Sequence, residues 1–385
     1  MKKQLTQLLF TSALSLPLFA HTMSDRVEKL EEEMKSVYAE NTMGTGGAQF
    51  GEASPAFQGS RWFLTADVLY WHAKAGGTEY AIAFNSASFP QKGNFKDCDF
   101  DWDLGLRFGI GRFLGDRNWD LNLTYTYFYT SDTESTHEPM ESAVPPLGQI
   151  QGVSHAKFNG VIDHNALDLT LGKNYFMSRK VSVHPFIGVK AAWLDQKYKF
   201  QGNDDINALQ SAFLVAGNVH NKVVSKCDFK GLGPKFGTNM DWFLGDGFRL
   251  FADLSGALFY SYCDVNFRQK VFVTPAGGQQ IQAHVRLSGD KHQFTPQVAF
   301  QGGLSWGTDL HMRNKNQYIE LGMGYEVQYF WRANQTLDIS DSMPPLTTTG
   351  PIRIEYGRSS EDIMFYGITF SGAVENQKNL EPFRI

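Results

Sequence analysis

The sequence predicts an all-β fold: a transmembrane antiparallel up-and-down β-barrel of about 10–12 strands with a short N-terminal helical segment. Three observations predict it. Every second side chain is apolar along many segments, the connections between these segments alternate between long and short, and aromatic residues make up 14% of the chain. The mean hydropathy is only -0.31, because half of each barrel strand faces water. The net charge of -5 does not indicate a nucleic-acid partner.

Residues 1–20 are predicted to be a signal peptide. Lys2 and Lys3 precede an apolar run from Leu8 to Phe19, and Ala20 is the expected residue before the cleavage site. The alternative is a short membrane anchor, but the run is too short for a spanning helix. The pattern therefore predicts export.

Residues 21–41 are predicted to form a periplasmic coiled-coil-like helix. Val27, Leu30, Met34 and Val37 are spaced three, four and three residues apart, as in a heptad seam. The seam is too short to hold alone, so it implies a partner, either sister chains in a homotrimer through residues 24–41 or some periplasmic component; the alternative is a solvated acidic helix. Residues 42–60 are rich in Gly, Ala and Ser and are expected to be a flexible linker.

The barrel is expected to cover residues 61–371, followed by a tail at 372–385. In the segment from Trp119 to Tyr129, odd-numbered residues are apolar or aromatic and even-numbered ones are mostly polar, which predicts a lipid face and a lumen face. In the segment 102–113, Gly105 alternates with apolar neighbours and leaves room for large inward side chains. The strands are expected near 61–73, 102–113, 119–131, 165–176, 181–200, 227–242, 248–262, 293–307, 317–331 and 362–371.

The connections predict the orientation of the barrel. They are long after the first, third, fifth, seventh and ninth strands and short after the others, as at 115–118 and 244–247. Outer-membrane barrels have short periplasmic turns and long outer loops. We therefore expect a bacterial outer-membrane location, contact with membrane lipid and a periplasmic N-terminus.

Other segments leave alternatives open. The segments 265–273, 281–287 and 352–356 could add strands or lengthen hairpins beyond the membrane. The loop 201–225 has an apolar helical face at Ile206, Leu209, Phe213 and Ala216, which could constrict the barrel mouth or pack on it as a lid.

Charged residues at inward positions are the candidate site. Opposed acids and bases across a water-filled constriction would select small hydrophilic solutes by charge and size. Alternatively, these groups pair with one another and fill a narrow barrel. The predicted pore-lining set is Asp67, Arg107, Asp120, Asp168, His184, Lys190, Lys235, Asp241, Arg249, Asp253, Glu320 and Glu326.

Three cysteines are expected at the long-loop end. If the turn at 244–247 is centred on Gly245, Asp241 lies opposite Arg249 and Cys227 opposite Cys263. Export permits a disulfide, so we predict one between Cys227 and Cys263, which leaves Cys98 free or for an intermolecular partner.

No cofactor, metal or catalytic site is expected. The histidines show no metal-ligand spacing, and the glycine-rich runs 109–115 and 231–237 lie inside predicted strands and not before helices. His184 near Asp168 could activate water, but no serine accompanies them at an adjacent inward position. We expect the protein not to be an enzyme, and a surface hydrolase is the distant alternative.

Three segments carry a family resemblance. The runs 183–198, 229–260 and 319–331, with Pro185, Gly188 and the Gly231, Gly233, Pro234, Gly237 pattern, resemble the Legionella-type major outer membrane proteins, which include similar porin-like proteins of environmental chlamydiae. The resemblance implies an abundant outer-membrane barrel with a porin role and offers no catalytic residues. We expect passive diffusion of small hydrophilic solutes and a structural envelope role. The alternative is a closed barrel acting as a surface adhesin or envelope scaffold.

Overall fold

The structure is a computed structural model of the chain. It describes residues 62–84, 93–114, 119–136, 141–143, 150–153, 155–178, 180–205, 217–275, 280–312, 315–342 and 353–377. The predictions of a signal peptide, a coiled-coil helix, a linker and an apolar helical face at 206–216 lie outside these residues.

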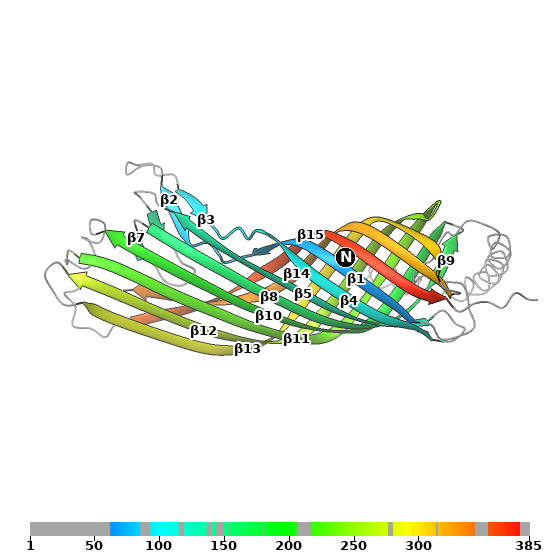
Figure 1. Cartoon of the computed structure of the whole chain (residues 1–385). Coiled ribbons are helices and arrows are strands. Elements are labelled where there is room, and N and C mark those ends of the chain that lie inside the picture. Colours follow the sequence, from blue (N-terminus) through cyan, green and yellow to red (C-terminus); the bar gives the residue numbers. More distant parts are fainter. Residues whose placement is uncertain are drawn as a thin grey trace, which may run out of the picture.

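Ten long strands form one closed antiparallel sheet (Figure 1). The sheet closes because β1 pairs with both β4 and β15, and β10 with both β8 and β11. Ten strands is the lower end of the expected range of 10–12. They are β1 (Trp62–Ala75), β4 (Trp102–Leu114), β5 (Trp119–Thr136), β8 (His155–Lys173), β10 (Val181–Asp205), β11 (Gly217–Gly245), β12 (Phe248–Pro275), β13 (Ile281–Met312), β14 (Lys315–Ser342) and β15 (Arg353–Gln377).

Five short strands lie outside the barrel wall or at its edge. β9 (Tyr175–Ser178) pairs with β10 beside a short turn. The others form a small sheet in the order β3-β2-β6-β7, built from two long connections. They are β2 (Ala81–Phe84), β3 (Gly93–Lys96), β6 (Glu141–Ala143) and β7 (Ile150–Val153).

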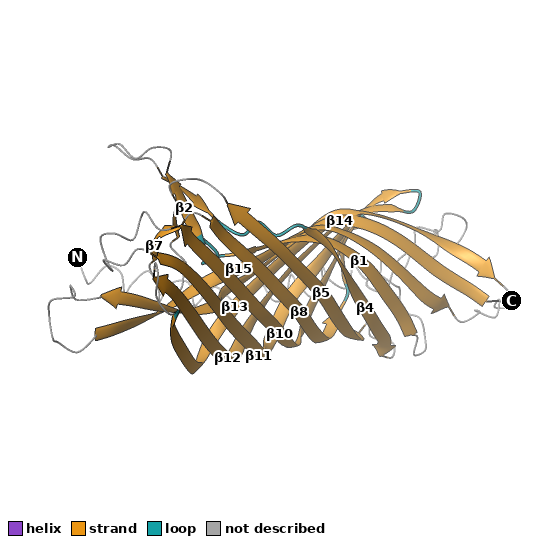
Figure 2. Ribbon diagram, turned by 60° about the vertical axis from the view of Figure 1, so that its left-hand side comes forward, coloured by secondary structure: helices purple, strands orange, loops and turns teal. Residues whose placement is uncertain are grey.

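Several strands extend far beyond a membrane. The longest, β13, has 32 residues, whereas a bilayer needs only about 9–11 residues in a tilted strand. The segments 265–273 and 281–287 and the described residues 353–356 therefore lengthen hairpins and do not add strands, and 217–225 belongs to β11 and not to a loop. The views in Figures 1 and 2 show an elongated barrel of steeply tilted strands.

An apolar belt covers the outer face of the barrel. Along β5 the odd-numbered residues from Trp119 (37% exposed) to Tyr129 (42%) point outward, as predicted. Exposed tryptophans mark both edges of the belt, with Trp62 and Trp242 near the short turns and Trp102 and Trp193 toward the long loops. These positions are typical of the aromatic girdles of membrane barrels. Among the described residues no helix has the length and apolarity to cross a bilayer.

Inward glycines make room for large side chains, as predicted. A Cβ atom on Gly111 would lie 1.9 Å from the Phe63 ring, and one on Gly172 would lie 2.3 Å from His184 Cε1. The Phe63 and His184 rings therefore occupy the space that side chains at positions 111 and 172 would otherwise fill.

The predicted register of the β11–β12 hairpin is wrong by two residues. Arg249 lies opposite Phe243, and Asp241 lies opposite Phe251. The cause is the position of the turn, which is centred on Asp246 and not on Gly245 and has positive φ at Gly245, Asp246 and Gly247. A bulge next to the turn leaves Leu244 without a pairing partner in the ladder.

The closed lumen as the candidate functional site

Arg107 is the centre of the largest ion-pair network in the lumen. Its Nη2 lies 2.7 Å from Glu326 Oε1, its Nη1 lies 3.3 Å from Asp67 Oδ2, and its Nε donates to Thr126. Glu326 also accepts hydrogen bonds from Gln328 Nε2 and from a threonine of β15. The guanidinium thus spans from β4 to β14, across two intervening strands.

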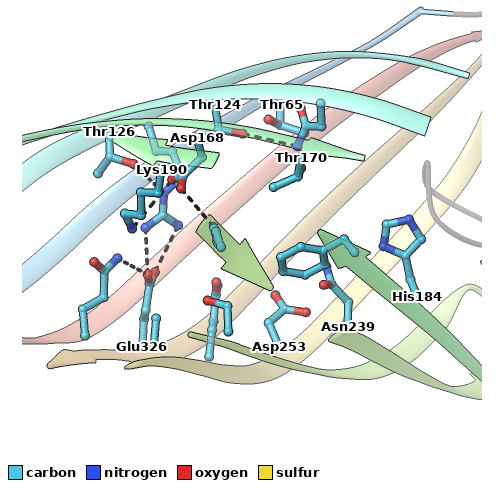
Figure 3. Close-up of a pocket in the computed structure, with 18 of the residues that line it drawn as sticks. Thr65, Thr124, Thr126, Asp168, Thr170, His184, Lys190, Asn239, Asp253 and Glu326 are labelled. Carbon is cyan, nitrogen blue, oxygen red and sulfur yellow. Dashed lines mark hydrogen bonds and ion pairs between the residues drawn. The ribbon is translucent and has the colours of Figure 1, made fainter. Parts of the chain in front are cut away.

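Asp168 joins two cations of neighbouring strands. Lys235 Nζ lies 3.2 Å from Asp168 Oδ1, and Lys190 Nζ lies 3.7 Å from Asp168 Oδ2. His184, expected near Asp168, instead pairs with Asp120, with 2.5 Å between Nε2 and Oδ2. In Figure 3, His184 lies apart from Asp168 and Lys190.

Arg249 organises a third network. It forms ion pairs with Glu320 and with Asp241, the latter at 3.4 Å, and its Nε donates to Ser305 Oγ at 2.8 Å. The Asp241–Arg249 contact was expected between directly opposite residues, and it forms although they are offset in register. Side chains this long reach diagonal neighbours across a sheet.

The twelve predicted residues all lie on the inner face, and eleven take part in these ion pairs. The twelfth, Asp253, lines a cavity of about 200 Å³ together with Asp168, Lys190 and Glu326 (Figure 3). Acids and bases therefore contact one another directly and do not face each other across open water. This arrangement matches the second sequence interpretation, in which charged groups fill the interior.

Aromatic side chains close the lumen on the long-loop side of the charged residues. Their rings come from seven strands and contact one another in a continuous group, here called the aromatic layer. Phe365 of β15 stacks on His164 of β8, with 4.9 Å between ring centroids, although four positions in the sheet order separate these strands. The layer consists of Trp71, Phe128, His164, Phe229, Phe259, Phe330 and Phe365.

The aromatic layer excludes water. Each of its seven side chains is at most 1% exposed, whereas rings on the wall of an open channel would be wetted on one side. The layer belongs to a larger buried apolar cluster that continues toward the long loops through Phe158, Phe200 and Phe267.

The β14–β15 hairpin bends inward above this layer. Its register shifts between Phe330 and Asn334, and Arg332 has a positive φ of 53°. Residues 333–337 are all buried, although a strand in the wall buries only alternate residues. The hairpin contacts the far wall at β10, where Ala333 O accepts from Gln196 Nε2 at 3.1 Å, and the residue after β1, where Asn334 Nδ2 donates to Gly76 O at 2.8 Å.

The predicted disulfide is not formed. Cys98, Cys227 and Cys263 are free and buried. The register explains the difference, because Cys227 lies opposite Val265 and Cys263 opposite Phe229, so the two thiols are diagonal neighbours. Each thiol has another partner: Cys227 Sγ donates to Ala333 O at 3.9 Å, and Cys263 Sγ accepts from Gln293 Nε2 at 4.0 Å.

Sequence reasoning did not find the aromatic layer or the bent hairpin. A signal for the layer was present, because Phe128 lies between Tyr127 and Tyr129 and so places an apolar ring at an inward position. The bend gave no such signal, because Arg332 is not a residue type that favours a positive φ.

The described part of the chain contains no group of three or more His, Cys, Asp or Glu side chains that could hold a metal ion.

The chain has only low sequence identity to the solved structures that it resembles. A search among curated proteins found no significant match. Similar solved structures include the outer membrane protease OmpT of Escherichia coli, at 10% identity over 82% of this chain and 96% of that chain, with a TM-score of 0.33. They also include a FadL homologue of Pseudomonas aeruginosa, at 10% identity, 86% and 96% coverage and a TM-score of 0.26.

The family is shown by a sequence model. The model described as the Legionella pneumophila major outer membrane protein precursor matches residues 55–375. This range covers the barrel strands from β1 to β14 completely and β15 up to residue 375. The chain is therefore an outer-membrane β-barrel and belongs to the Legionella major outer membrane protein family.

Proposed function

We propose that the protein acts as an envelope barrel whose lumen is closed, with its long-loop end presented at the cell surface as a scaffold or adhesin. The observation that carries this proposal is the aromatic layer, whose rings are at most 1% exposed. We place the short turns and the N-terminus on the periplasmic side, as is usual for outer-membrane barrels.

The free energy needed to open the aromatic layer supports a lumen that stays closed. Burial of one large apolar side chain contributes about 1.5–3 kcal/mol. Wetting the six Phe and Trp side chains of the layer would therefore cost about 9–18 kcal/mol, which corresponds to a very small open population. The inward hairpin adds a second obstruction, held by hydrogen bonds such as those of Ala333 and Asn334.

The second candidate is the porin function that the sequence predicted, with passive diffusion of small hydrophilic solutes. The cavity of about 200 Å³ favours it, because its wall carries Arg107, Lys190, Lys235 and facing acids, as a charge-selective passage requires. In this case solutes would pass only after the aromatic layer and the hairpin had moved.

Liposome swelling distinguishes these functions. The purified barrel is reconstituted into liposomes, and swelling is followed in isotonic solutions of uncharged sugars of increasing size. A closed barrel gives swelling no faster than protein-free liposomes, whereas size-dependent swelling establishes the porin. A refolded open porin of another family is the positive control.

Two further parts of the proposal concern assembly and chemistry. A trimer held by residues 24–41 would lose its cross-linked oligomers when these residues are deleted, while the barrel itself still folds. The protein would also have no hydrolase activity, and His184→Ala compared with the parent in lipid and peptide hydrolysis assays tests this expectation.

A further inference from the structure

Six outward-facing cations lie in three directly opposite pairs on four neighbouring strands. Lys197 of β10 lies opposite Lys226 of β11, and Lys222 of β11 lies opposite Lys270 of β12. The third pair joins β12 and β13. These six residues, here called the cation band, are Lys197, Lys226, Lys222, Lys270, Arg268 and Arg286.

Within each pair the two cations repel each other. Like charges directly opposite across strands destabilise a sheet. Within the part of the chain that the structure describes, none of the six forms an ion pair within 4 Å. Repulsion by Lys199, burial and repulsion by Lys226 lower the pKa of the Lys197 ammonium. An external anion would relieve this repulsion.

The position of the band relative to the membrane indicates which anion. Lys197 lies four residues beyond Trp193 of the aromatic belt toward the long loops, and Lys270 lies eight beyond Tyr262. Because a tilted strand rises by roughly 2.5 Å per residue along the barrel axis, the cations lie about 10–20 Å above the belt. A phospholipid headgroup layer is only about 5–7 Å thick on each side of a bilayer.

An acidic row separates the belt from the cations. Asp195 lies opposite Asp163 and Asp228, and Asp264 lies opposite Asp228 and Asp290, all at the level just above the belt. This row repels phosphate groups at the height where a phospholipid carries them. Anions attracted by the cation band must therefore extend farther from the hydrocarbon.

We propose that the cation band binds the phosphate groups of a phosphorylated glycolipid of the outer leaflet, whose sugars hold phosphates well above the acyl chains. Lys and Arg are suited to this ligand, since Arg can bind phosphate bidentately and Lys acts as a point charge. The assignment rests on the orientation given under the proposed function, and it does not depend on whether the lumen conducts.

Binding of purified lipopolysaccharide to the full-length barrel in detergent tests the site. The variant Lys226→Gln/Arg268→Gln removes one cation from each of two pairs, and Lys226→Glu/Arg268→Glu reverses both charges. Each cation lost is expected to weaken binding about fivefold, so the Gln variant should bind roughly 25-fold more weakly and the Glu variant more weakly still. The matched control is Lys74→Glu/Lys96→Glu, two cations outside the band, which should bind as the parent does.

Folding and lipid source are controlled separately. Heat-dependent gel mobility verifies that each variant is folded, and the Gln variant decides the outcome if the Glu variant does not fold. Equal binding by the Gln variant and the parent would overturn the site. Equal binding of dephosphorylated lipopolysaccharide, or of phosphatidylglycerol, would overturn the assignment to a phosphorylated glycolipid.

Discussion

The guanidinium carbon of Arg107 lies 5.5 Å from the centre of the Trp71 ring, which joins the largest ion-pair network to the aromatic layer. Trp71 Nε1 also donates to Thr369 Oγ1 at 3.2 Å, and that hydroxyl donates to Glu326 at 3.0 Å. Glu326 in turn binds Arg107. The residues that close the lumen and the residues that carry its charge therefore stabilise each other.

Replacing Arg107 by Met is expected to destabilise the barrel strongly. The change leaves the buried carboxylates of Glu326 and Asp67 without their cation, which typically costs about 3–5 kcal/mol. The free energy of unfolding, measured by urea titration in lipid vesicles, checks this. The exposed Lys74→Met should change it by less than about 0.5 kcal/mol.

A second replacement tests whether charge or packing is responsible. In Arg107→Met/Glu326→Met both partners become apolar, so the double variant should be more stable than the sum of the single effects predicts. Additive effects would contradict an ion pair between these residues.

Gly172→Ala is expected to destabilise the fold through His184. The added Cβ would lie 2.3 Å from His184 Cε1, and overpacking of this kind costs about 1–3 kcal/mol. Gly372→Ala is the matched control, because its Cβ would meet Ala66 O at 3.5 Å, an ordinary contact. Equal unfolding free energies for the two variants would show that the lumen is looser than described.

Two substitutions at the bend residue Arg332 are expected to have opposite effects on the inward hairpin. Its φ of 53° suits glycine, so Arg332→Gly should preserve or strengthen the inward hairpin, whereas the β-branched Arg332→Val should strain it. Limited proteolysis of the folded barrel, with cleavage within β14 and β15 identified by mass spectrometry, measures the difference. Faster cleavage of the glycine variant would contradict the bend.

The sequence predicts the strands of the barrel wall better than the side-chain contacts inside the lumen. The dyad pattern from Trp119 to Tyr129 and the alternation of loop lengths predicted ten strands and their lipid face, because the membrane imposes both. The closure depends on long-range contacts such as Phe365 on His164, and no local pattern specifies them. The Asp241 register failed because the turn is centred on Asp246 and not on Gly245, which moves every pair by two residues.

Cys98 is expected to be almost unreactive in the folded protein. Burial raises the pKa of its thiol from 9.0 to about 12, so its thiolate fraction at pH 8 should be about a thousandfold lower than in the unfolded chain. Maleimide labelling of Cys227→Ala/Cys263→Ala, with and without denaturant, measures this ratio. The raised pKa means that labelling should increase as the pH rises toward 12, and rapid labelling at pH 7 would contradict the burial.

The most direct test of the closed lumen is single-channel conductance in planar lipid bilayers, comparing the parent with Phe330→Ala/Phe365→Ala. Both rings are at most 1% exposed and link the two sides of the aromatic layer. The account predicts no stepwise openings in the parent and measurable ones in the double variant. Regular ion-selective openings of the parent barrel would contradict it.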